Sequence, residues 1–166
     1  VNPHPIIEVG KTPPIFTLPH TAGHLVSLAD SRGRAVVLFF GSDVCPVSKQ
    51  YAGRMAELAR DYANDSRVKF LAIDSNTNAR AAKVADLKLI HMDRIPTLLD
   101  PMATVARSYG ATVTPTFCVI DAAGNLQYSG AFDDGQDKSD GTGEFCASAL
   151  QHTMNGVPVA ISSTQA

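Results

Sequence analysis

The sequence has few cysteines, no large excess of charge of either sign and no long hydrophobic run. Its 166 residues include only three cysteines, which are too few, and odd in number, for a disulfide framework. It has no Cys-x-x-Cys pair and no cysteine–histidine run at zinc spacing, which argues against a structural zinc site. No apolar run approaches the ~20 residues of a membrane-spanning helix. A net charge of −2 argues against a nucleic-acid or anionic-membrane partner.

The length and composition fit one globular domain. Hydrophobic residues make up 45% and charged residues 18%, which is ordinary for such a protein. We interpret residues 1–9 as an N-terminal tail, 10–157 as the domain and 158–166 as a C-terminal tail. The chain begins at Val1 and not at Met, so either a leader was removed or the sequence starts at a chosen boundary.

Hydrophobic patterns predict strands and helices in alternation. The continuous apolar runs at 35–40 and 68–74 are typical of strands buried on both faces, and helical periodicity runs from Pro46 to Tyr62 between them. These three pieces predict a βαβ unit with parallel strands. The remaining predictions are an extended arm with short strands at 15–18 and 25–28, helices at 79–89, 102–109 and 144–155, and strands at 116–120 and 126–130.

Cys45 is the first candidate functional residue, because it lies between the strand ending at Phe40 and the helix beginning at Pro46. A helix N-terminus carries about half a positive charge and unpaired N–H groups, which acidify a thiol. Pro46 suits the first helical position, where a missing N–H costs nothing. Lys49, one turn on, and Ser42, three residues upstream, are further candidates to stabilise a thiolate. The alternative is a buried, inert cysteine.

Thr114-Pro115 is the second candidate feature, since it directly precedes the strand at 116–120. Ligands of α/β sheets collect at the carboxyl ends of strands, and a cis-proline loop facing Cys45 would expose backbone groups to an extended substrate. From the residues alone an ordinary turn proline is the preferred interpretation, because only about 5–6% of X-Pro bonds are cis.

The other two cysteines are candidates for a resolving thiol. Cys118 falls within a predicted central strand, so we expect it to be buried and unreactive. Cys146, near the start of the last helix, is expected to be semi-exposed and is the possible resolving residue. Nothing in the sequence places it within the ~4.4–6.8 Å Cα separation that a disulfide with Cys45 requires.

No metal site is predicted. The aspartates between 133 and 140 lack the EF-hand spacing, so a solvated acidic loop is expected. The five histidines are scattered, and only His20 and His24 share one turn. Arg94 and Arg107 are interpreted as surface charges.

Four segments together resemble the redoxin families of the thioredoxin fold. They are residues 12–18, 23–28, 33–40 with Cys45-Pro46, and 109–117 followed by 121–124. The resemblance is to the alkyl hydroperoxide reductase / thiol-specific antioxidant group and its thioredoxin-like relatives. It implies an α/β thioredoxin-like fold, with a central mixed β-sheet flanked by helices on both faces and an N-terminal extension. It also implies a reactive Cys45 and a cis Pro115.

The sequence departs from both parent families. Ser42 stands where we place the first cysteine of the thioredoxin CxxC, so the usual internal disulfide cannot form. Ser42 with Cys45-Pro46 matches the peroxiredoxin pattern, but Leu38 replaces the proline of that pattern. Thr114-Pro115 stands in the region of the peroxiredoxin active-site arginine. The chain therefore resembles most closely a peroxiredoxin-like branch intermediate between the two.

Three functions follow from these features. In the first, the Cys45 thiolate exchanges with a protein or small-molecule disulfide, and an external thiol reductant resolves the product. In the second, the same cysteine reduces a hydroperoxide. In the third, the fold is a non-catalytic binding module, in which Cys45 is a residual thiol or a copper(I) ligand. Thr114-Pro115 favours disulfides. No cofactor is expected, the oligomeric state is not predicted, and a redoxin without an initiator Met favours a periplasmic or extracytoplasmic location.

Overall fold

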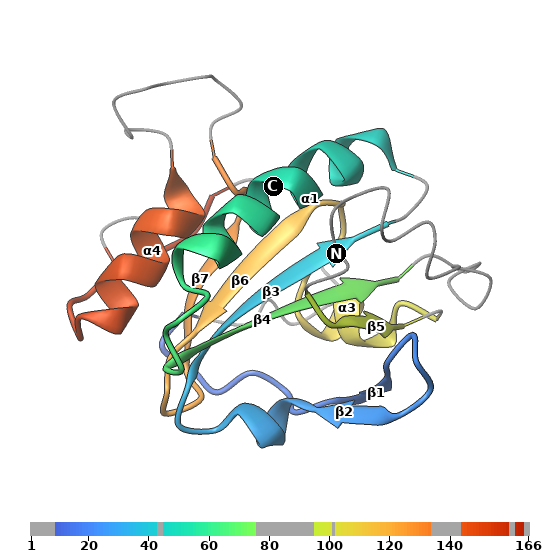
Figure 1. The fold of residues 1–166 in the computed structure, drawn as a ribbon, viewed down its shortest axis with the longest axis horizontal. Helices are drawn as coiled ribbons and strands as arrows, with labels where there is room; N and C mark the ends of the chain where they lie inside the picture. Colours follow the sequence, from blue (N-terminus) through green and yellow to red (C-terminus); the bar gives the residue numbers. More distant parts are fainter. Residues whose placement is uncertain are drawn as a thin grey trace, which may run out of the picture.

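The computed structural model describes residues 9–42, 45–75, 95–100, 102–133, 144–159 and 162–164 (Figure 1). Its strands are β1 (Thr17–Pro19), β2 (Leu25–Ser27), β3 (Ala35–Gly41), β4 (Val68–Asp74), β5 (Thr97–Leu99), β6 (Thr116–Ile120) and β7 (Leu126–Gly130). Its helices are the 3-10 helix η1 (Leu28–Ser31) and the α-helices α1 (Pro46–Asp61), α3 (Thr104–Ser108) and α4 (Phe145–Met154). Within these ranges no helix has the length and apolar character needed to cross a lipid bilayer.

A five-stranded mixed sheet forms the centre of the fold, in the order β5-β4-β3-β6-β7. β3 is buried along its whole length and pairs parallel with β4 and antiparallel with β6. The predicted βαβ unit of β3, α1 and β4 is therefore confirmed. A central strand can be continuously apolar because both of its faces pack against other elements.

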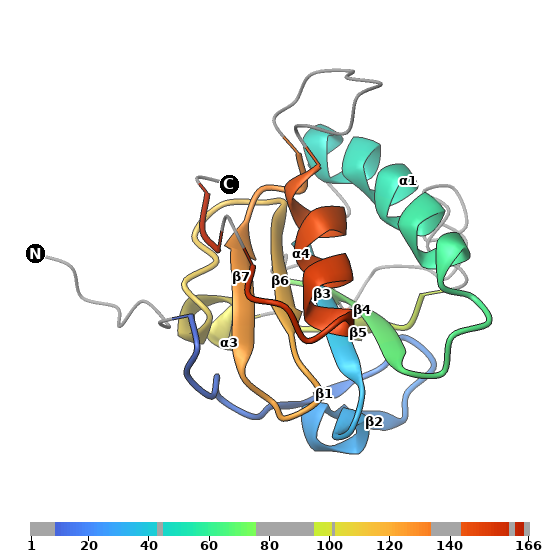
Figure 2. The same cartoon turned by 90° about the vertical axis from the view of Figure 1, so that its left-hand side faces the viewer.

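Different elements cover the two faces of the sheet (Figure 2). Successive residues of a strand point to opposite sides. Accordingly, Val37 and Phe39 pack with α1 and α4, whereas Leu38 and Phe40 pack with α3, η1 and the N-terminal hairpin. Both views show α1 and α4 on the same face. The prediction of a mixed sheet with helices on both faces is confirmed.

The N-terminal extension is part of the packed fold. β1 and β2 pair antiparallel, and His20 forms a bridge to Leu98 that joins this hairpin to β5. Phe16 is buried against the second face of the sheet. The Tyr109 hydroxyl donates a hydrogen bond to the Pro14 carbonyl at 2.6 Å, which ties the arm to the end of α3.

Some elements differ from the sequence predictions. The pattern gives no prediction of β5, because a three-residue strand after Pro96 is too short to show periodicity. The helix predicted at 102–109 is reduced to α3. Its N-cap Ala103 has a left-handed φ of 52°, and the buried Asp100 carboxylate accepts hydrogen bonds from the first turn. The helix predicted at 79–89 lies outside the described residues.

The end of the described chain lies along β7. Ser163 forms a parallel bridge with Ser129. Gly130 has a φ of +152°, and a Cβ added there would lie 2.3 Å from the Thr164 hydroxyl oxygen. The open edge of β7 offers backbone groups that a further segment can pair with, and the described residues 162–164 do so.

Candidate active site

Cys45 is the N-cap residue of α1, in the loop that joins β3 to the helix. Its carbonyl accepts a hydrogen bond from the Lys49 N–H at 3.1 Å, and its N–H donates to the Ser42 carbonyl at 3.2 Å. Pro46 occupies the first helical position, as predicted. The partly exposed sulfur therefore lies at the positive end of a 16-residue helix.

Hydrogen-bond donors around the sulfur lower its pKa. Burial alone would raise the pKa of the Cys45 thiol. The Ser48 N–H, the side chains of Thr114 and Ser48, and the Val47 N–H together outweigh burial and bring the pKa from 9.0 to about 7. Each of these donors stabilises the thiolate more than the thiol. Roughly half of the molecules therefore carry the nucleophilic thiolate at pH 7.

Ser48 is a site residue that the sequence analysis does not single out. It is 2% exposed, and its Oγ accepts a hydrogen bond from the Ser42 N–H at 3.2 Å. The hydroxyl proton is then available to the Cys45 sulfur. The signal is the spacing, because Pro46 marks the first helical position and Ser48 is then the third, one turn from Cys45. The structure thus pairs Cys45 with Ser48 across the first turn, and the Ser42 N–H is bonded to the Ser48 hydroxyl oxygen.

The Thr114-Pro115 loop faces the sulfur. Its peptide bond is cis, as the family resemblance implies and in contrast to the ordinary turn proline that the residues alone favour. The Cys45 Sγ lies 4.0 Å from the Thr114 carbonyl oxygen. The Thr116 hydroxyl donates to the Val113 carbonyl at 2.7 Å, which holds the loop at the start of β6. The expected opposition of this loop and the thiol is confirmed.

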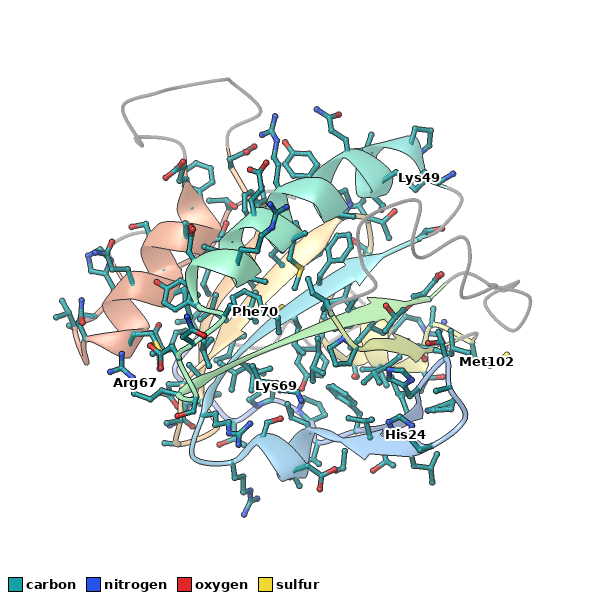
Figure 3. The ribbon with its side chains drawn as sticks, viewed as in Figure 1. His24, Lys49, Arg67, Lys69, Phe70 and Met102 are labelled. Atoms are coloured by element: carbon teal, nitrogen blue, oxygen red, sulfur yellow. The ribbon has the colours of Figure 1, made fainter. Side chains whose placement is uncertain are left out.

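The basic residues that the sequence suggested near the site are Lys49, Arg94 and Arg107. Figure 3 shows Lys49 at the N-terminal end of α1, with its side chain directed away from the sheet. The groups that lower the pKa of Cys45 are hydrogen-bond donors, and the Lys49 amine is not one of them. Arg107 is exposed on α3, as expected for a surface charge. Arg94 lies outside the described residues.

The family is established by a match that spans this site. The model of the AhpC/TSA family matches residues 9–129, from the N-terminal arm through β6 and most of β7. The chain belongs to the AhpC/TSA family.

Similar proteins share both the sequence pattern and the fold of this AhpC/TSA member. The thiol-disulfide oxidoreductase ResA of Bacillus thuringiensis subsp. konkukian is 27% identical over 124 residues, covering 72% of this chain and 68% of ResA. The crystal structure of the hypothetical protein SMc02350 from Sinorhizobium meliloti has 29% identity and a TM-score of 0.80, over 97% of this chain and 93% of that one. A thiol-disulfide oxidoreductase from Bacteroides fragilis has 20% identity and a TM-score of 0.68, over 88% and 98%, which is a likeness of fold. The expected thioredoxin-like fold is confirmed.

The other two cysteines of this AhpC/TSA member are fully buried, on opposite faces of the sheet. Burial raises the pKa of Cys118 to about 12 and also raises the pKa of Cys146. The expectation of a semi-exposed Cys146 is wrong, because this residue faces the sheet from the first turn of α4 and packs in the core with Leu150. All three cysteines are free thiols. The buried Cys146 sulfur is not accessible to an attacking or attacked group in this structure.

The other polar clusters are the paired histidines of the N-terminal hairpin and the aspartates that begin at Asp133. His20 and His24 stack with 4.4 Å between ring centroids. Asp133 is buried and paired with Arg54, so this end of the acidic loop is not solvated as expected. Residues 134–140 lie outside the described residues. In the part of the chain that the structure describes, no group of three histidine, cysteine or acidic side chains could hold a metal ion.

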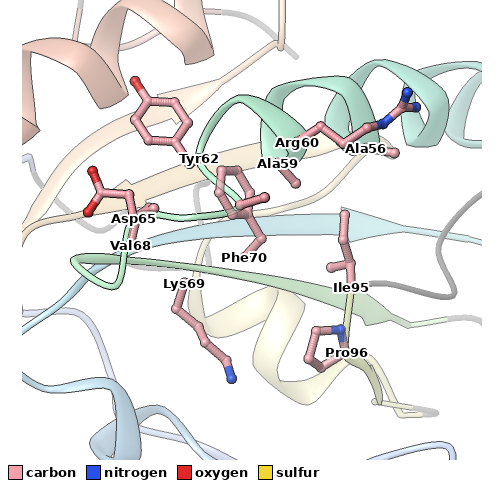
Figure 4. A pocket seen from close by; sticks show the side chains of 11 residues that line it. Ala56, Ala59, Arg60, Tyr62, Asp65, Val68, Lys69, Phe70, Ile95 and Pro96 are labelled. Atoms are coloured by element: carbon pink, nitrogen blue, oxygen red, sulfur yellow. The ribbon is translucent and has the colours of Figure 1, made fainter.

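A cavity of about 780 Å³ opens at the opposite end of α1 from Cys45 (Figure 4). Its lining comes from the C-terminal half of α1, the start of β4 and the segment before β5, and includes Arg60, Tyr62, Phe70, Ile95 and Pro96. A helix of 16 residues is roughly 24 Å long. The cavity therefore does not belong to the Cys45 site at the start of α1.

Proposed function

We propose that this protein carries out thiol–disulfide exchange with Cys45 as its single reacting thiol. The observation that carries the proposal is the arrangement at the start of α1. There a thiol with a pKa of about 7 faces the Thr114 carbonyl at 4.0 Å and has the Ser48 hydroxyl, not a second thiol, one turn away. The likenesses to ResA and to the Bacteroides fragilis protein support it, since both names describe thiol-disulfide oxidoreductases.

The reaction has two exchange steps. The Cys45 thiolate attacks one sulfur of the substrate disulfide, the S–S bond breaks, and the other sulfur leaves as a thiolate. Cys45 is now joined to half of the substrate in a mixed disulfide. An external thiolate then attacks the substrate sulfur of this mixed disulfide and releases Cys45 as a thiolate. Its low pKa makes Cys45 a good leaving group in the second step. The substrate half ends in a disulfide with the external thiol. Cys45 is again a thiolate, so its oxidation state is the same before and after the two steps.

Trapping the intermediate tests this proposal. After incubation with a peptide disulfide and an acid quench, mass spectrometry should find one peptide per chain. The adduct should be absent from Cys45→Ser and retained in Cys118→Ala. The proposal fails if the wild type forms no adduct while its thiol still reacts with iodoacetamide. It also fails if Cys45→Ser forms as much adduct as the wild type.

The variant Ser48→Cys tests the single-thiol step directly. A thiol one helical turn from Cys45 is within reach of a disulfide. It should attack the Cys45 sulfur, release the peptide thiol and leave an internal disulfide two mass units lighter than the dithiol. The mixed disulfide should then no longer accumulate. Persistence of the adduct in Ser48→Cys would contradict the proposal that the mixed disulfide accumulates because no thiol lies at position 48.

Peroxide reduction by the same thiol is the second candidate, favoured by the match to the AhpC/TSA family and by the acidified Cys45. The thiolate would attack one peroxide oxygen, break the O–O bond and form a sulfenic acid and a hydroxide or alkoxide. Dimedone labelling after hydrogen peroxide, timed against adduct formation with the same concentration of peptide disulfide, separates the two activities. The action of an external thiol reductant and an extracytoplasmic location stay predictions.

A further inference from the structure

The cavity at the C-terminal half of α1 has the size of a small-molecule site. Its volume is about 780 Å³, and such sites span about 300–1,000 Å³. It lies between α1 and the start of β4. In the described part of the chain β5 pairs with β4 only from Ala72 to Asp74, which leaves the side of β4 at Val68–Phe70 open to the cavity. The proposed exchange reaction at Cys45 makes no use of this space.

The back of the cavity is apolar. Figure 4 shows the Phe70 and Ile95 side chains pointing from β4 and from the segment before β5 toward Ala59 of α1. Both belong to the hydrophobic core, and the Phe70 ring packs against Tyr62 with 6.3 Å between ring centroids. The core therefore holds this apolar surface in place before any ligand arrives, and a ligand that contacts it pays little for ordering side chains.

Two basic side chains flank the apolar back of the cavity. Figure 4 shows Arg60 on the α1 side and Lys69 on the β4 side. Within the described ranges neither of them takes part in an ion pair. Asp65 is the one acidic side chain in the described lining, and it accepts hydrogen bonds from the Arg67 guanidinium at 3.0 and 2.8 Å. Because Arg67 balances the charge of Asp65, the surroundings of the cavity have a net positive charge.

A small organic anion with an apolar body fits these features. Its apolar part would contact Phe70 and Ile95, and its negative group would interact with Arg60 and Lys69. The C-terminal end of a helix carries about half a negative charge, which opposes an anion here, but the two full positive charges exceed it. We propose that this cavity is a binding site for such an anion, separate from Cys45 and independent of the proposed function.

Two fluorescent probes with the same aromatic body test the proposal. Anilinonaphthalene sulfonate carries a negative charge, and phenylnaphthylamine lacks it. Fluorescence titration of the full chain should show saturable binding of both probes. In Arg60→Gln/Lys69→Gln the dissociation constant of the sulfonate should rise about 10-fold, because each exposed ion pair contributes about threefold to affinity. The dissociation constant of phenylnaphthylamine should change by less than about twofold, because this probe has no charge to pair.

Two further variants locate the bound probes. Ala59→Phe places a ring in the cavity from α1 and should abolish the binding of both probes, with circular dichroism to verify that the variant is folded. Arg107→Gln removes an exposed arginine on α3 and should change neither dissociation constant.

The proposal is overturned if the sulfonate binds the double variant as tightly as the wild type, or if both probes are weakened equally there. It is also overturned if a folded Ala59→Phe still binds them, or if the wild type binds neither probe. Failure of the proposed function has a different signature, because Cys45 would then form no mixed disulfide while the probes still bind at this cavity.

Discussion

Cys45 and Cys146 both lie at the start of a helix, yet their thiols are shifted in opposite directions. Cys45 is the N-cap of α1 and Cys146 is the second residue of α4. Hydrogen-bond donors lower the pKa of Cys45 to about 7, whereas burial raises the pKa of Cys146. A helix N-terminus by itself therefore does not make a reactive thiol in this protein.

The difference lies in what each sulfur faces. The N-cap side chain of Cys45 lies over the N–H groups of its own first turn and across from Thr114. The side chain of Cys146 points into the core between α4 and the sheet, where it packs with hydrocarbon. N–H and O–H donors stabilise a thiolate, and removal from water destabilises it. The direction of the Cα–Cβ bond therefore decides whether the pKa of the thiol is lowered or raised.

The difference between Cys45 and the buried cysteines should be largest in the alkylation rates of the native protein. With excess iodoacetamide, one cysteine per chain should react rapidly. Cys118 and Cys146 should react at least about 1000-fold more slowly, because they must wait for an opening that costs several kcal/mol. Peptide mapping of the labelled protein identifies the site, and all three cysteines should label in denaturant. Rapid native labelling of Cys146 would show that α4 opens readily and would restore Cys146 as a resolving thiol.

A polar side chain in place of Cys146 should lower the free energy of unfolding without changing the Cys45 site. Cys146→Ser places a hydroxyl in the apolar core and should cost about 1–3 kcal/mol of unfolding free energy. Urea denaturation measures this, with Cys146→Ala as the control that removes the sulfur and adds no hydroxyl. The alkylation rate of Cys45 should not change. Equal stability of Cys146→Ser and the wild type would mean that water reaches this side chain.

Much of the fold follows from local patterns. The strands at 68–74, 116–120 and 126–130 have the predicted bounds, because continuous apolar runs and a turn between paired strands are local signals. In the site, Cys45 follows from a strand before it and Pro46 after it. The place of Ser48 one turn from Cys45 also follows from its spacing after Pro46. Which way a side chain points is set by tertiary packing, so the inward direction of Cys146 is not visible in the sequence.

The reactivity of Cys45 should follow a pH curve centred near 7. The thiolate is the reacting form, so the rate rises as the proton is lost. With a pKa of about 7, roughly one tenth of the thiol is ionised at pH 6 and nine tenths at pH 8. The iodoacetamide rate should therefore increase about 10-fold over this interval and level off above it. A rate that keeps rising to pH 9 would show that the donors at the start of α1 do not stabilise the thiolate, and the contrast with Cys146 would then rest on burial alone.

The smallest effect we expect is that of Ser48→Ala, which distinguishes the contribution of the Ser48 hydroxyl to the pKa of Cys45 from that of the backbone N–H donors. Ser48→Ala removes the side-chain donor but keeps the N–H groups of the first turn, so the pKa of Cys45 should rise only part of the way to its ordinary value. The alkylation rate at pH 6 should fall about threefold to fivefold and should match the wild type above pH 9.5, where both thiols are ionised. Ser148→Ala, an exposed serine on α4, is the matched control. A loss that persists at high pH would mean that Ser48 positions the loop through its bond to the Ser42 N–H and contributes nothing to the ionisation of the thiol.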